Sequence, residues 1–154
     1  MTIDSELRVR PIEPQDLASV IDILIAGSLN PEVEDPTCPE DYWRAVEDVR
    51  SRDGEVFVAE YEGQPVGVCQ VVIFRNIGNA GRRVAEIENV HVREAFRSQG
   101  IGEQMIRACE ELAATRDCHR VQLTSNVSRT DAHRFYERIG YSASHKGFKK
   151  SLRR

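Results

Sequence analysis

Hydrophobic and polar residues follow two different periods along this chain, and the two periods mark different elements. Strand-like runs predict strands over residues 7–12, 55–61, 66–74, 84–92 and 119–125, and the last of these alternates clearly between apolar and polar residues. A period of three to four residues predicts helices over residues 14–26, 40–50, 100–116 and 130–139. The closing stretch, residues 141–152, predicts one or two further strands. Strands and helices are therefore expected along the whole chain.

The order of these elements predicts how the strands pair. Three consecutive strands between residues 55 and 92 are joined by short connections, which favours antiparallel pairing. The strand–helix–strand step across residues 84–125 favours a parallel pair with a right-handed crossover. We therefore expect an α/β (α+β) fold, with one mixed sheet and helices on both of its faces.

Composition limits the class of protein further. The 154 residues are 40% hydrophobic and 30% charged, which is ordinary for a globular protein, and no repeat or long linker divides them. We expect a single domain over residues 1–154. No apolar run approaches the roughly 20 residues of a membrane span, and the charged first ten residues lack the apolar core of a signal peptide. A cytoplasmic protein with no membrane partner is therefore expected.

Charge and cysteine content exclude two further kinds of ligand. The net charge of −4 argues against a nucleic-acid partner held by bulk electrostatics. The four cysteines are scattered without a Cys-x-x-Cys pair, which argues against a metal site. We therefore expect neither nucleic acid nor a metal ion, and the cysteines are interpreted as free thiols.

A turn between the fourth predicted strand and the next helix is the most informative stretch of the chain. Its residues are Arg97, Ser98, Gln99, Gly100, Ile101 and Gly102. A glycine-bearing turn that leads into a helix offers backbone N–H groups and the positive end of the helix dipole to an anion. The dinucleotide and P-loop motifs are excluded, because Met105 replaces the third glycine and no Lys-Ser or Lys-Thr follows. Two interpretations stay open, a phosphate-binding turn and a turn that only begins a helix.

Two motifs in the expected order give the chain a resemblance to a known family. Residues 92–102, Val-Arg-Glu-Ala-Phe-Arg-Ser-Gln-Gly-Ile-Gly, resemble the strand end and pyrophosphate loop of the GNAT superfamily of acetyl-CoA-dependent N-acetyltransferases. Residues 132–141, Ala-His-Arg-Phe-Tyr-Glu-Arg-Ile-Gly-Tyr, are similar to the family's Ala-x-x-Phe-Tyr-x-x-x-Gly-Phe signature. The resemblance covers nearly the whole chain. It implies the GNAT-like acyl-CoA N-acyltransferase fold, with six to seven strands flanked by four helices.

The resemblance implies acetyl-CoA as the cosubstrate and assigns residues to it. The pyrophosphate would lie on the backbone amides of the turn 97–102. The pantetheine arm would pair like an extra strand with the backbone of Val90, His91 and Val92. The family commonly has Asn six residues before the signature Phe, where this chain has Arg129. Asn126 could replace that contact, and Arg129 could instead approach a cofactor phosphate.

The resemblance also places a proton acceptor on the fourth predicted strand. Strand alternation puts Glu86 and Glu88 on one face with Val90 and Val92, and His91 on the other, where its side chain is interpreted as structural. Glu88 is the first candidate to take the proton of the amine, and Glu86 is the second. The alternative is that both glutamates form cross-strand ion pairs.

The second motif supplies the other catalytic candidate, Tyr136. In similar enzymes the tyrosine at this position protonates or stabilises the leaving thiolate. A phenol, with a pKa of about 10, is a suitable proton donor to a thiolate of comparable basicity. The alternative is a core tyrosine whose hydroxyl binds to the backbone.

Together these residues predict an N-acetyltransferase that transfers the acetyl group of acetyl-CoA directly to a primary amine, preferably of a small molecule. The alternatives are a non-catalytic acyl-CoA sensor, a protein N-acetyltransferase, and transfer of a longer acyl group. Several acidic residues lie in or near the first long loop: Glu32, Glu34, Asp35, Glu40 and Asp41. They suit a cationic amine substrate, and the alternative is an acidic loop that is simply exposed to solvent. Homodimers are common among similar proteins, so a homodimer is a further possibility.

Overall fold

The structure is a computed structural model that describes residues 6–152, and its chain divides into two compact units. The first unit runs to Gln122, and the second begins at Leu123. Residues 1–5 and 153–154 lie outside the described part of the chain. The single domain expected over residues 1–154 stays a prediction.

The predicted elements up to residue 123 are all present, with bounds within three residues of those expected. The strands are β1 (Leu7–Pro11), β2 (Glu55–Tyr61), β3 (Gln64–Arg75), β4 (Arg83–Val92) and β5 (Cys118–Leu123). The helices are α1 (Leu17–Gly27), α2 (Pro39–Ser51) and α4 (Ile101–Thr115), and α3 (Gly78–Gly81) is a single turn. Among the described residues, no helix is both long enough and apolar enough to cross a bilayer.

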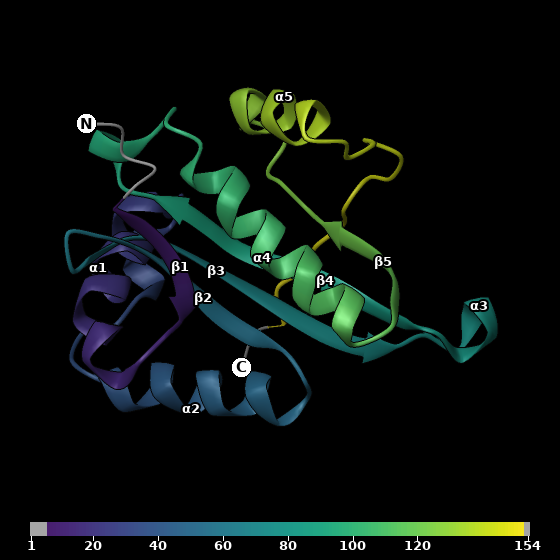
Figure 1. The fold of residues 1–154 in the computed structure, drawn as a ribbon, viewed down its shortest axis with the longest axis horizontal. Coiled ribbons are helices and arrows are strands. Elements are labelled where there is room, and N and C mark those ends of the chain that lie inside the picture. Colours follow the sequence, from purple (N-terminus) through teal and green to yellow (C-terminus); the bar gives the residue numbers. More distant parts are fainter. Residues whose placement is uncertain (1–5, 153–154) are drawn as a thin grey trace. The chain divides into compact units, whose positions relative to one another are not determined.

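The strands form one sheet in the order β1-β2-β3-β4-β5. The first four strands pair antiparallel with their neighbours, as the short connections predicted. β5 follows α4 and runs in the direction of β4 (Figure 1). The sheet is therefore mixed, and the crossover through α4 brings β5 beside β4.

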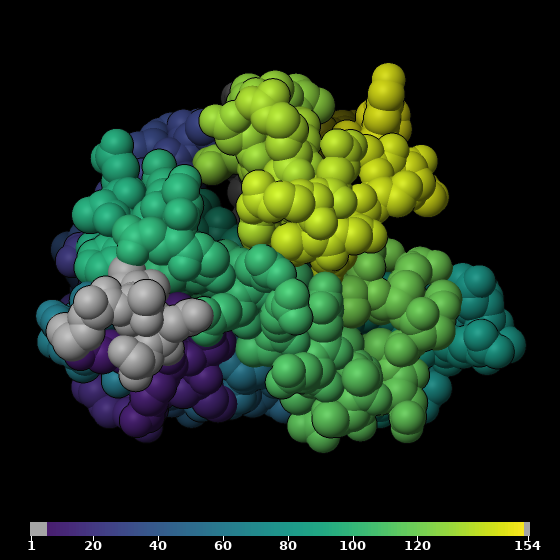
Figure 2. Space-filling model, turned by 45° about the horizontal axis from the view of Figure 1, so that its top comes forward, coloured from purple at the N-terminus to yellow at the C-terminus, as the bar shows by residue number. Residues whose placement is uncertain are grey.

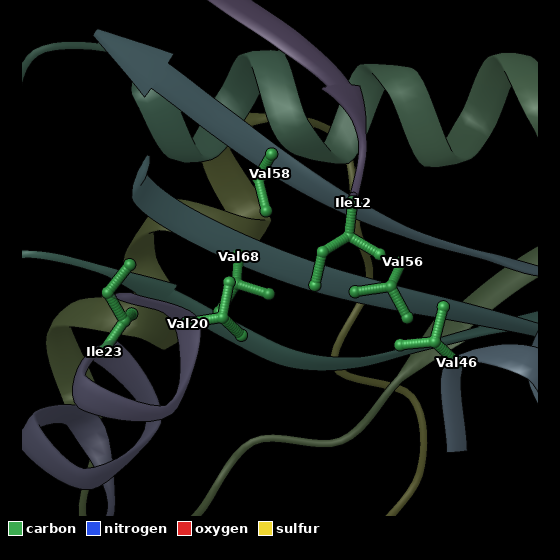
Figure 3. Close-up of a cluster of buried hydrophobic side chains, with 7 residues drawn as sticks. All are labelled: Ile12, Val20, Ile23, Val46, Val56, Val58 and Val68. Atoms are coloured by element: carbon green, nitrogen blue, oxygen red, sulfur yellow. The ribbon is translucent and has the colours of Figure 1, made fainter. Parts of the chain in front are cut away.

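Helices α1 and α2 cover one face of the sheet. Cross-strand pairing places Val58 of β2 opposite Val68 of β3, so both side chains point to this face. Figure 3 shows the buried cluster that they form with another β2 residue, with side chains from the two helices and with the residue after β1: Val56, Val20, Ile23, Val46 and Ile12. We call this face of the sheet, marked by Val58 and Val68, the α1 face.

Helix α4 covers the opposite face. A Cβ atom built on Gly67 of β3 would lie 3.1 Å from the sulfur of Met105, so helix and strand approach each other closely here. Cys69 and Cys109 are fully buried on the same side, with their sulfur atoms 3.5 Å apart. The hydrogen bond between the two thiols, together with burial, raises the pKa of Cys69. Both are free thiols, as predicted. The outer side of α4 is exposed on the surface in Figure 2.

The second unit contains one helix, α5 (Thr130–Arg138), and no strand in its described residues beyond Leu123. The one or two strands predicted over residues 141–152 are wrong, so the sheet has five strands instead of six to seven. This segment has few apolar residues, and its side chains Phe148 and Leu152 are 91% and 88% exposed. A strand gains little stability from a segment that buries no regular apolar face.

Candidate functional site

Strand β4 contains a bulge at the place where the candidate catalytic residues lie. Glu88 pairs with β3 on one side of the bulge and His91 on the other, and between them Asn89 and Val90 stand opposite a single residue. Asn89 has a φ of 54°, a left-handed conformation that Asn adopts more readily than most residues. The extra residue reverses the alternation of the side chains that follow.

This reversal changes which side chains share a face. Glu88 lies opposite Gln70, and His91 lies opposite Val68; Gln70 and Val68 alternate normally on β3. Glu88 and His91 therefore both point to the α1 face. The prediction that Glu88 shares its face with Val92, and that His91 points away from that face, is wrong. Val92 pairs with Gly67 and faces α4.

The two candidate proton acceptors, Glu86 and Glu88, share the α1 face as predicted, and both are half-buried. The carboxylate of Glu86 accepts a hydrogen bond from the Gln122 side chain of β5 at 3.3 Å. Glu88 lies directly beside the bulge and closer along the chain to the turn 97–102. The irregular backbone beside Glu88 distinguishes it from Glu86 as the first candidate.

The imidazole of His91 lies against the last residue of α1. A Cβ atom built on Gly27 would lie 2.3 Å from Nδ1 and 2.8 Å from Cγ of His91, so a side chain at Gly27 would displace the ring. The assignment of the His91 backbone to the cosubstrate stays a prediction. Its side chain lies on the same face as Glu88, which sequence reasoning missed, and the signal for this was Asn89, which tolerates the left-handed conformation of the bulge.

The turn 97–102 leads into α4 as predicted. Ser98 and Gly100 are both left-handed, with φ values of 61° and 80°, and Gly100 is the N-cap of α4. No side chain caps this helix. Its first N–H groups therefore have no acceptor within the helix. Residues 97–100 are exposed, whereas Ile101 is 1% exposed and anchors the turn in the core.

These features fit an anionic ligand. Nothing lies within 4 Å of a Cβ atom built on Gly100, so the space beside the turn is open. The Arg97 guanidinium donates through Nε to the carbonyl of Val92 at 3.1 Å, which ties the turn to the end of β4. Open N–H groups at the positive end of a helix dipole bind phosphate groups well. The turn can therefore hold the pyrophosphate of coenzyme A.

Replacing Gly100 with Ala is expected to weaken coenzyme A binding about tenfold, a free-energy change of about 1.4 kcal/mol. The added methyl group would project into the open space beside the helix N-terminus. Gly63→Ala is a matched control, because Gly63 has a φ of 77° and open space around it. Both variants should lose about 1 kcal/mol of stability through left-handed strain. Calorimetric Kd values that are equal for the two variants would contradict the assignment.

The loop between α1 and α2 is ordered partly by its own acidic residues. The Tyr42 hydroxyl donates to the Glu34 carboxylate at 2.7 Å and accepts a hydrogen bond from the Asp35 N–H group at 2.8 Å. The hydroxyl and N–H groups of Thr37 donate to the Asp35 carboxylate and lower its pKa. These two carboxylates stabilise the loop, and a role for them in binding a cationic amine stays a prediction.

The second unit holds the remaining candidates. The ring of Tyr136 on α5 lies next to Phe135 and Tyr141, with centroid distances of 5.1 Å and 6.0 Å. The Asn126 carboxamide oxygen accepts two hydrogen bonds within its own turn, from the residue two positions later. Arg129 is the N-cap of α5. The cosubstrate contacts assigned to Asn126 and Arg129, and the catalytic role of Tyr136, stay predictions.

Comparison with known proteins agrees with the two sequence motifs. The model of the acetyltransferase (GNAT) family matches residues 21–141, and the mixed sheet flanked by helices agrees with that match. The chain belongs to the GNAT family of acetyltransferases. It is an acetyl-CoA-dependent N-acetyltransferase, and the resemblance drawn from the sequence is confirmed.

Three similar proteins illustrate the relationship. Glucosamine 6-phosphate N-acetyltransferase of Trypanosoma brucei brucei is 31% identical over 144 residues, which cover 92% of this chain and 91% of the relative. Aminoalkylphosphonate N-acetyltransferase of Salmonella typhimurium is 41% identical over 90 residues, 58% of each chain. A crystal structure described as a transcriptional regulator from Bacillus halodurans superposes with a TM-score of 0.87 at 34% identity, covering 95% of this chain and 99% of the other.

Other predictions concern location, assembly and metal content. The described residues contain no group of three or more His, Cys, Asp or Glu side chains that could hold a metal ion. The cytoplasmic location, the homodimer and the absence of nucleic-acid, membrane and metal partners stay predictions.

Proposed function

We propose that this protein acetylates the primary amine of a small molecule that also carries a phosphate or phosphonate group. The observation that carries the proposal is the position of Glu88, whose carboxylate lies on the α1 face directly beside the β4 bulge and could take the proton of an amine. The same unit contains the uncapped start of α4. The acceptor class is supported by two relatives, which are named for glucosamine 6-phosphate and for aminoalkylphosphonates. Those two substrates share an amine and a phosphorus-containing anion.

The reaction follows from direct attack of the amine on the thioester of acetyl-CoA, which supplies the acetyl group. The new C–N bond forms as the C–S bond breaks. One proton of the amine passes to the carboxylate of Glu88, and the departing sulfur takes a proton from the hydroxyl of Tyr136. Backbone N–H groups near the β4 bulge stabilise the developing oxyanion. Cys69 and Cys109 take no part in this scheme, because both thiols are fully buried in the core with their sulfur atoms 3.5 Å apart.

A thioester-consumption assay tests the proposal. Release of free coenzyme A thiol is measured with acetyl-CoA and a panel of primary amines. The panel contains 2-aminoethylphosphonate and glucosamine 6-phosphate, their counterparts without the anionic group, propylamine and glucosamine, and a peptide with an N-terminal alanine. We expect kcat/KM to be at least about tenfold higher for a phosphorylated or phosphonate amine than for its counterpart without the anion. Release with the peptide alone, or coenzyme A binding without release on any amine, would contradict the proposal.

A further inference from the structure

A polar cavity lies at the end of the sheet farthest from the turn 97–102. Its volume is about 470 Å³, within the range of small-molecule sites. Its walls come from the tip of the β3–β4 hairpin, which carries α3, from the end of α4 and from the turn before β2 (Figure 1). The ten residues of β4 run between this cavity and the turn 97–102, a length of about 30 Å. The cavity is therefore separate from the site described above.

The charged residues that line this cavity are four arginines and two aspartates. Their net charge is +2, whereas the chain as a whole carries −4. The members are Asp53, Arg75, Arg82, Arg83, Arg116 and Asp117. A hollow with an excess of one sign of charge concentrates ligands of the opposite sign. The cavity therefore favours an anion.

Two of the arginines are arranged at a cost to the sheet. Arg75 and Arg83 stand directly opposite each other on the antiparallel strands β3 and β4. Like charges in such a pair are destabilising, because the two side chains project from the same face close together. The Asp53 carboxylate lies 3.2 Å from the guanidinium of Arg83 and offsets part of this repulsion. Arg75 has no carboxylate partner among the described residues and donates to the Gly81 carbonyl at 3.1 Å.

The other two arginines keep donors for a ligand. Arg116 donates through Nε to the Asp53 carbonyl at 3.3 Å, and its terminal nitrogens donate to no other described residue. The exposed side chain of Arg82 has no hydrogen-bond or ion-pair partner in residues 6–152. A guanidinium group has five N–H donors in a planar fork, which can bind two phosphate oxygens at once. The dipole of α4 favours a cation at Arg116, but it accounts for only this one of the four arginines.

From these observations we propose that the cavity binds a small ligand that carries phosphate groups and at least two negative charges. This charge balances the +2 of the lining and relieves the repulsion between Arg75 and Arg83. The arginines approach from β3, from the start of β4 and from the end of α4. A tetrahedral phosphate presents oxygens to several such directions, whereas a carboxylate presents two oxygens in one plane. The proposal does not depend on the acceptor amine.

Calorimetric titration with pyrophosphate tests this proposal. Coenzyme A is present at saturation, so that the turn 97–102 is occupied, and ionic strength is constant, so that screening is the same in every titration. We expect one pyrophosphate to bind per chain. Arg116→Gln and Arg82→Gln should each raise its Kd about tenfold or more, because each removes hydrogen bonds between a charged donor and the anion. The Kd of coenzyme A and the unfolding temperature serve as folding controls.

Arg107→Gln is the matched control variant. Arg107 lies on the same helix, nine residues before Arg116, and its exposed side chain pairs with Glu103. Its replacement removes the same charge from the chain and no donor from the cavity. The Kd of pyrophosphate should therefore change less than about twofold, since exposed charges more than a Debye length apart are largely screened.

Three results would overturn the proposal. Absence of pyrophosphate binding in the wild type, or an unchanged Kd in either cavity variant, would place the anion elsewhere or nowhere. An equal loss in Arg107→Gln would show attraction by overall charge alone. Citrate bound as tightly as pyrophosphate would contradict the phosphate class.

Discussion

Glu88→Gln is expected to lower kcat by about 10²- to 10⁴-fold, because the variant keeps the shape of the side chain and loses its capacity to take a proton. The loss should be greatest at low pH, where few amine molecules are neutral without help from a base. The measurement is kcat at saturating acetyl-CoA and amine across a range of pH. Affinity for coenzyme A should stay unchanged, since the turn 97–102 is separate from this side chain.

Glu86→Gln is the matched control for this experiment. Glu86 lies on the same strand and the same face, two residues earlier, and its carboxylate accepts a hydrogen bond from Gln122 at 3.3 Å. Its replacement should change kcat by no more than a few-fold, because it alters only one hydrogen bond between a neutral amide and a carboxylate, away from the reacting atoms. An equal loss in both variants, or wild-type turnover in Glu88→Gln, would remove Glu88 from the mechanism.

Tyr136→Phe is expected to lower kcat by about 10²-fold and to leave the Kd of coenzyme A unchanged, because the substitution removes only the hydroxyl that protonates the departing sulfur. The end of α5 holds this residue in place within its unit. The Tyr136 carbonyl accepts a hydrogen bond from the Tyr141 N–H group at 2.9 Å, and Gly140 provides the left-handed residue that this ending requires. The fold of the helix should therefore survive the substitution.

Tyr141→Phe controls for the general effect of removing a hydroxyl from this aromatic cluster. Its ring lies 6.0 Å from that of Tyr136, centroid to centroid, in the same unit. Turnover in Tyr141→Phe should stay within about threefold of the wild type, because a hydroxyl that takes no part in proton transfer contributes little to the barrier. Wild-type turnover in Tyr136→Phe would refute the assignment.

The elements of the first unit were predictable because their signals are local. Strand β2 has the bounds Glu55–Tyr61 in sequence and structure alike, since it is a short apolar run with a turn on each side. The turn before α4 was predictable for the same reason, because Gly100 adopts a left-handed conformation that few other residues tolerate. The outcome at residues 141–152 was not predictable in this way, because strand formation there depends on partner strands that a local pattern does not reveal.

The faces of β4 could not be predicted from alternation alone. One extra residue at Asn89 shifts every later side chain to the other side of the sheet, and no change in hydrophobicity announces it. For this reason Glu86 and Glu88 were placed correctly relative to each other, whereas His91 was assigned to the wrong face. The contact between His91 and Gly27 joins residues distant in sequence, and only the fold brings them together.

The uncapped start of α4 has a consequence for how this enzyme can evolve. If peptide N–H groups hold the pyrophosphate, most point mutations at the exposed positions 97–99 leave the acetyl donor bound, because every residue except proline supplies the same group. In the proposed function, by contrast, the acceptor amine meets individual side chains on the α1 face. Single substitutions there would then change the amine that is acetylated, while the acetyl donor stays the same.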